Sequence, residues 1–167
     1  MKALKITKDE TIRHGNGYVT NGHYMFIAGE NTVSDKSVQS LIDAGIQFSR
    51  SKVGGLLMGD KALTFDAERV IPEKMGDDKI LRETSFLFKH SNGDVYQVFK
   101  HDSGRVVGVD VRYSPLWENR LCTQKEALSA IRVENSQGEV VAVVMPVNVE
   151  KDLIREIRFM ANDIPAL

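Results

Sequence analysis

The residues best suited to chemistry in this chain of 167 residues are four histidines and one cysteine. They are His14, His23, His90, His101 and Cys122. No two histidines have the His-x-x-x-His spacing that presents two metal ligands on one face of a helix. A zinc site would need residues from separate strands, and ordinary hydrogen-bonded histidines are the simpler interpretation. We therefore expect no metal and no cofactor.

The sequence contains no recognisable catalytic motif. Cys122 has no histidine or acid beside it, so the sequence gives no sign of an activated thiol nucleophile. The chain also lacks a Gly-x-Ser-x-Gly elbow and the glycine-rich loops that bind phosphate. The remaining enzyme hypothesis is a site assembled from distant residues, such as His23, His101 and Asp102. We expect a protein that is not an enzyme.

Composition limits the classes of partner. Hydrophobic residues make up 42% of the chain and charged residues 27%, a mixture typical of a globular domain. The formal net charge of −1 argues against a general attraction to nucleic acid or to an anionic membrane. A single cysteine fits a reducing compartment. Residues 1–5 do not begin a secretory signal, and no run reaches the ~20 apolar residues of a membrane span, so we expect one cytoplasmic domain over residues 1–167.

The elements that would position the candidate residues are mostly strands. Asn-Gly pairs at residues 16–17 and 21–22 predict tight turns, because both residue types tolerate positive φ. Regularly spaced turns between residues 56 and 113 predict a meander of antiparallel hairpins. The longest apolar run, residues 140–149, predicts a strand buried on both faces. This strand should bulge or end near Pro146, which has no N–H to donate.

Two amphipathic helices complete the expected architecture. Over residues 35–48, apolar side chains recur at spacings of three and four, and Ser34 can cap the N-terminus. Over residues 150–161, the apolar face consists of Leu153, Ile154, Ile157 and Met160. Helices beside an antiparallel sheet predict an α+β fold.

Two segments near opposite ends of the chain resemble one known family. Residues 20–25 are Thr-Asn-Gly-His-Tyr-Met, and residues 143–149 are Val-Val-Met-Pro-Val-Asn-Val. They resemble the Thr-Asp-Gly-His-Arg-Leu strand and the C-terminal Val-Val-Met-Pro-Met-Arg-Leu strand of the bacterial DNA polymerase III beta subunit, the sliding clamp. Residues 128–135 are similar to that family's penultimate strand. The chain departs from the family pattern at Asn21, Tyr24, Asn148 and Val149, and it is long enough for about one of the family's three domains.

The resemblance implies a DNA-clamp-like fold, in which the helix at residues 35–48 matches the family's order of helix and strands, while the helix at residues 150–161 follows the strand that ends the family's chains. It also implies a processivity factor of DNA replication, of a kind that a phage could encode. In the family, these strands line a hydrophobic pocket that captures short linear motifs of polymerases and other replication proteins. Here the corresponding pocket residues are Thr20, His23, Met25, Leu128, Ala130, Val143, Met145 and Pro146. Met and Val offer an adaptable apolar surface to a peptide Leu or Phe, while Thr and His can bond its polar groups.

The resemblance leaves two modes of action open. A clamp that encircles duplex DNA would have to be a homo-oligomer with cations facing the phosphates. The candidate DNA-binding residues are Lys36, Arg50 and Lys52. The alternative is a monomeric protein-binding or regulatory module that uses the same pocket without surrounding DNA. In neither case do we expect a membrane partner.

Overall fold

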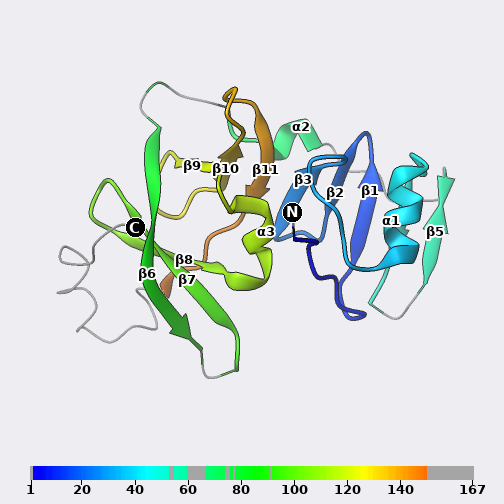
Figure 1. The fold of residues 1–167 in the computed structure, drawn as a ribbon, viewed down its shortest axis with the longest axis horizontal. Coiled ribbons are helices and arrows are strands. Elements are labelled where there is room, and N and C mark those ends of the chain that lie inside the picture. Colours follow the sequence, from blue (N-terminus) through cyan, green and yellow to red (C-terminus); the bar gives the residue numbers. More distant parts are fainter. Residues whose placement is uncertain are drawn as a thin grey trace.

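The protein is organised around one antiparallel sheet of 11 strands (Figure 1). The computed structural model describes residues 2–52, 55–59, 67–73, 76, 78–90 and 92–149. The strands are β1 (Ile12–Gly15), β2 (Tyr18–Thr20), β3 (Tyr24–Ile27), β4 (Phe48–Arg50), β5 (Leu56–Met58), β6 (Lys79–Lys89), β7 (Val95–His101), β8 (Val106–Asp110), β9 (Leu121–Gln124), β10 (Ile131–Glu134) and β11 (Val140–Val144). The helices are α1 (Lys36–Asp43), α2 (Ala67–Val70) and α3 (Ser114–Trp117), and the 3₁₀ turn η2 (Val111–Tyr113) precedes α3.

The expected α+β, clamp-like arrangement with two main amphipathic helices is wrong. The large sheet dominates the described residues, where α1 has 8 residues and α2 and α3 have 4 each. The helix expected over residues 150–161 lies outside the described residues.

The first helix is shorter than predicted because it is capped at both ends. Asp35 is the N-cap in place of Ser34, and its carboxylate accepts hydrogen bonds from the N–H groups of Ser37 and Val38. At the other end Gly45 has φ of 69°, and the N–H of Ile46 donates to the carbonyl of Leu41. A residue with positive φ at this position stops an α-helix. The apolar spacing that continues to residue 46 therefore belongs partly to a loop.

The strand order divides the sheet into two halves. The N-terminal half has the order β5-β4-β1-β2-β3, and the C-terminal half has the order β11-β10-β9-β6-β7-β8. The two halves meet where β3 pairs with β11, with Val143 opposite Met25 and Val144 opposite Tyr24. The prediction for the apolar run is confirmed, because β11 is buried from Val141 to Val144 and ends before Pro146.

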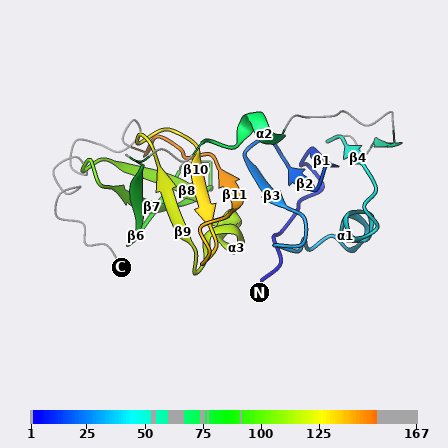
Figure 2. The ribbon, with the colours of Figure 1, turned by 90° about the horizontal axis from the view of Figure 1, so that it is seen from above.

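The main core lies on one face of this sheet, together with helices α1 and α3. Figure 2 shows α1 and α3 on one side of the strands and α2 on the other. The core includes Val38 and Ile42 of α1, Leu116 and Trp117 of α3, and strand residues such as Phe26 and Val144. On the α2 side, a smaller cluster contains Met25 and Val143, packed against Tyr18, Ile71, Ala130 and Val140. We call this group the apolar cluster.

Within the described part of the chain, no helix is both long enough and apolar enough to cross a membrane.

Candidate functional site

The two segments that carry the family resemblance lie side by side. Their central residues pair in β3 and β11, and beyond the strand ends the N–H of Met145 donates to the carbonyl of His23 at 2.9 Å. We call this junction, from His23 to Met25 and from Val143 to Met145, the β3–β11 seam. Residues from opposite ends of the described chain are therefore brought into one ladder of backbone hydrogen bonds.

The interior of the seam is closed. Met25 is 4% exposed and Val143 is 2% exposed, and Ile71, which follows α2, packs against both as part of the apolar cluster. Ala130 belongs to the same cluster, and Thr20 lies opposite Met25 in the pairing of β2 with β3. The space between Met25, Val143 and Ile71 does not admit water. Four of the predicted pocket residues thus lie together, but they do not form an open apolar cleft.

The exposed part of the seam is its end. Met145 is 42% exposed, the His23 side chain is exposed, and Pro146 is half-buried. Leu128 is 44% exposed on the loop between β9 and β10, and it is not part of the apolar cluster. The surface available to a partner is therefore the Met145 end rather than the whole set of predicted residues.

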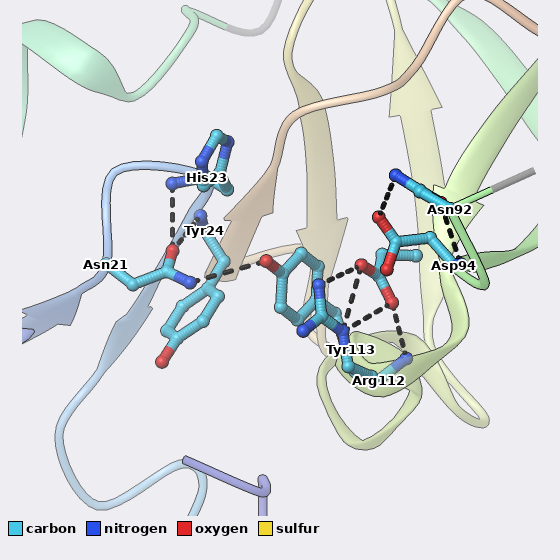
Figure 3. Close-up of polar contacts among 8 residues, drawn as sticks. Asn21, His23, Tyr24, Asn92, Asp94, Arg112 and Tyr113 are labelled. Carbon is cyan, nitrogen blue, oxygen red and sulfur yellow. Dashed lines mark hydrogen bonds and ion pairs between the residues drawn. The ribbon is translucent and has the colours of Figure 1, made fainter. Parts of the chain in front are cut away.

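A rigid turn presents His23 at this end of the seam (Figure 3). The carboxamide oxygen of Asn21 accepts hydrogen bonds from the N–H groups of His23 and Tyr24, at 2.8 and 3.0 Å. Gly22 takes φ of 91°, a conformation that glycine adopts without strain. The Thr20 hydroxyl donates to the carbonyl of Tyr24 and accepts from the N–H of Gly22. We had expected this hydroxyl to bond a peptide. Both of its described bonds lie within the turn instead, so it is not free to do so.

A second feature, the polar cavity, adjoins the same turn. It has a volume of about 440 Å³ and is lined by Thr7, Asp9, Glu10, Thr11, Asn21, His23, Lys52, Arg112 and Tyr113. These residues come from the segment before β1, the turn before β3, the residues after β4, and η2. The Asn21 carboxamide donates to the Tyr113 hydroxyl at 3.3 Å and so joins two of these segments (Figure 3).

The arginines near the cavity are held by their own aspartates. Arg112 forms a two-pronged pair with Asp110, with its terminal nitrogen 2.6 Å from one carboxylate oxygen, and this bond raises the pKa of Arg112 (Figure 3). Arg50 lies 3.0 Å from a carboxylate oxygen of Asp35 and donates to the carbonyl of Thr7. Both guanidinium groups are therefore bonded to carboxylates of the protein itself.

Glu10 differs from these arginines. Its Oε2 atom is buried and has no hydrogen-bond partner among the described residues. Burial raises the pKa of the Glu10 carboxyl, although the charges of Arg112 and Arg50, and hydrogen bonding from the Thr7 backbone and the Asn21 side chain, act to lower it. The hydroxyl of Tyr24 also lacks a partner, and burial, followed by the charge of Glu10, raises its pKa. A buried polar atom without a partner is costly, so this corner of the cavity is suited to a ligand that supplies a donor.

The predicted DNA-binding residues are not gathered into one group of free cations. Lys36 is exposed at the first residue of α1, and Lys52 is exposed at the polar cavity. The Arg50 side chain is 16% exposed and paired with Asp35. This pairing has no local sequence signal, because the two residues lie 15 positions apart in different elements.

The residues of the enzyme hypothesis have separate contacts. The Nδ1 atom of buried His101 lies 2.7 Å from the Ser103 hydroxyl, and Asp102 lies 3.9 Å from the Nε atom of Arg82. The described contacts of His23 are with Asn21 and Met145. Among residues that the structure describes, no group of three or more His, Cys, Asp or Glu side chains could hold a metal ion. Burial also raises the pKa of the Cys122 thiol to about 12, which keeps it in the unreactive protonated form.

No family model, curated protein or solved structure matches this chain.

Sequence reasoning identified the seam but missed the polar cavity. Glu10, Asn21, Arg112 and Tyr113 are spread over the chain and have no motif spacing. One local signal was available: Asp110 and Arg112 are two residues apart, a spacing that lets a short turn close an ion pair. The other contacts depend on how the two halves of the sheet meet.

Proposed function

We propose that the protein is a protein-binding module that captures a short linear segment of a replication protein at the Met145 end of the β3–β11 seam. The observation that carries the proposal is the bond from the Met145 N–H to the His23 carbonyl. It unites the two segments that resemble the peptide-binding strands of sliding clamps. Exposed Met145 supplies an adaptable apolar contact for a Leu or Phe, and exposed His23 supplies a polar contact beside it.

The proposal restricts binding to the open end of the seam. Ile71 already covers Met25 and Val143, on the surface where the resemblance would place an apolar side chain of the peptide. We assign no catalytic step to the protein. We also propose a cytoplasmic location, because a lone free thiol fits a reducing compartment.

A homo-oligomer that surrounds duplex DNA is the second candidate. One observation favours contact between copies: β5 stands at the end of the sheet, and Leu56, Leu57 and Met58 are 49%, 45% and 45% exposed. An apolar strand at a sheet edge can pair with the same strand of another copy. The paired state of Arg50 argues against DNA contact through the predicted residues, so we rank the monomeric module first.

Fluorescence anisotropy tests the first candidate. A labelled peptide of the Gln-x-x-Leu-Phe type is titrated with the wild-type protein, Met145→Asp and Leu87→Asp. Leu87 is a matched control because it is also an exposed apolar residue, at 63%, but lies on β6. We expect micromolar binding that Met145→Asp weakens by about tenfold or more and Leu87→Asp leaves unchanged. Absence of binding by the folded wild type, or an equal loss in both variants, would contradict the proposal.

Light scattering after size-exclusion chromatography tests the second candidate. If β5 joins copies, the wild-type protein is an oligomer and Leu57→Asp is a monomer that keeps its peptide affinity. A wild-type monomer at all concentrations removes the ring hypothesis and leaves the module.

A further inference from the structure

The polar cavity is lined by a carboxylate, that of Glu10, with one oxygen that lacks a hydrogen-bond donor in the described part of the chain. The Oε2 atom of Glu10 is buried and has no hydrogen-bond partner among the described residues. A carboxylate oxygen is an acceptor only, so what it lacks is a donor, and a charged donor makes the stronger bond.

The neighbouring cations only partly offset the cost of burying this carboxylate. Arg112 and Arg50 lie close enough to influence Glu10, but each is bonded to its own aspartate, Asp110 and Asp35. Each arginine–aspartate pair has a net charge of zero. Each arginine is therefore shared between Glu10 and an aspartate, and burial remains the main reason that the pKa of Glu10 is raised.

The remaining groups of the cavity leave room for a cation. Asp9 and Lys52 are exposed, and their opposite charges nearly balance. The Tyr113 hydroxyl oxygen accepts the bond from Asn21 and keeps a second lone pair that can accept from a cation. A volume of about 440 Å³ accommodates an amino-acid side chain with its water. Because the described residues form no metal-ligating group, an organic cation fits better than a metal ion.

We propose that Glu10 receives the positively charged side chain, lysine or arginine, of the partner segment that binds at the seam. His23 connects the two places: its carbonyl accepts the bond from Met145 in the seam, and the residue also lines the polar cavity. A segment seated on Met145 can pass His23 and place a basic residue beside Glu10. This inference rests on the proposed function and adds to it a requirement for a basic residue next to the apolar anchor.

Paired peptides test the requirement. The Gln-x-x-Leu-Phe-type peptide is flanked at either end by lysine or by norleucine, which has a similar aliphatic chain without the charge. Wild-type protein should bind one lysine-flanked peptide about tenfold more tightly than its norleucine counterpart. Glu10→Gln should abolish this advantage, whereas Glu139→Gln, the same substitution at an exposed site on the β10–β11 turn, should keep it. Thermal melts verify that both variants are folded.

The outcomes separate the two proposals. If both flanked peptides bind with equal affinity to the wild type, the cation site is wrong and the seam proposal stands. If no peptide binds, the proposed function fails. Nα-acetyl-lysine amide, which keeps its charged ε-amine, is then titrated alone while the amide resonances of Asn21 and Tyr113 are followed by NMR. Shifts in the wild type that are lost in Glu10→Gln support a cation site independent of the seam. The absence of such shifts overturns it.

Discussion

The β3–β11 seam and the polar cavity share His23 but are built in opposite ways. The seam is formed by two adjacent strands, whose backbone ladder fixes the position of every side chain along it. The cavity is formed by four separate segments, and side-chain bonds such as that between Asn21 and Tyr113 hold it together. The seam thus gains its order from regular backbone pairing, whereas the cavity depends on a few polar contacts between irregular segments.

The two regions also differ in how completely their groups are satisfied. In the seam, Met25 and Val143 are covered by apolar neighbours. In the cavity, Glu10 and Tyr24 each retain a buried polar atom without a partner. Substitutions in the seam should therefore remove stabilising contacts, while a substitution at Glu10 should relieve an unfavourable one.

The largest effect is expected in the seam interior. Met25→Ala should lower the free energy of unfolding by about 2–5 kcal/mol, because it leaves a cavity beside Val143 and Ile71. Met145→Ala is the matched control, since Met145 is 42% exposed and should lose less than about 1 kcal/mol. Urea denaturation measures both. Similar losses for the two variants would mean that the interior and the end of the seam do not differ as described.

An intermediate effect is expected at the turn that links the two regions. Asn21→Ala removes two bonds within the turn and the bond to Tyr113, and should lower the free energy of unfolding by about 1–2 kcal/mol. Asn92→Ala provides the comparison. Asn92 accepts from the N–H of Asp94 in another exposed turn, but its described bonds are confined to that turn (Figure 3). If both variants lose the same stability, the bond to Tyr113 contributes little.

The smallest effect, and the one of opposite sign, is expected at Glu10. Its pKa is raised above the ordinary value of 4.5, so the folded chain binds this proton more tightly than the unfolded chain. Stability is therefore lost as the pH rises from 4.5 through the raised pKa. Glu10→Gln should make the protein more stable at pH 7 and remove that part of the pH dependence.

Melting temperatures measured between pH 4 and pH 8 test this expectation, with Glu139→Gln as the control that should follow the wild type. A Glu10→Gln protein that is less stable than the wild type at pH 7 would show that the ionised carboxylate is satisfied, contrary to its place in the cavity.

The sequence predicted what depends on local pattern. The apolar run at residues 140–149 identified β11, and Pro146 correctly marked the region where this strand ends. The stripe at Val38 and Ile42 identified α1, but spacing alone could not show that Gly45 would end it. The fold class was wrong because apolar periodicity overestimated the length of the first helix and gave no measure of how far one sheet would extend.

The cavity was beyond prediction for a different physical reason. Its bonds join residues far apart in sequence, such as Asn21 with Tyr113, and depend on the closure of the sheet between β3 and β11. No periodicity encodes such contacts, since each residue by itself fits a solvated turn. Only the Asp110–Arg112 pair, closed within one turn, had a local signal.

The strand order has a consequence for the way the chain is synthesised. The five strands of the N-terminal half, residues 12–58, leave the ribosome before the C-terminal half, yet the edge of β3 is completed only when β11, residues 140–144, has been made. Until then the nascent half presents an open strand edge of the kind that aggregates or attracts chaperones. Pairing across so much intervening chain also makes this the step most exposed to the entropy of loop closure. The contact that creates the proposed binding surface can thus form only after β11, the last of the described strands, has been made.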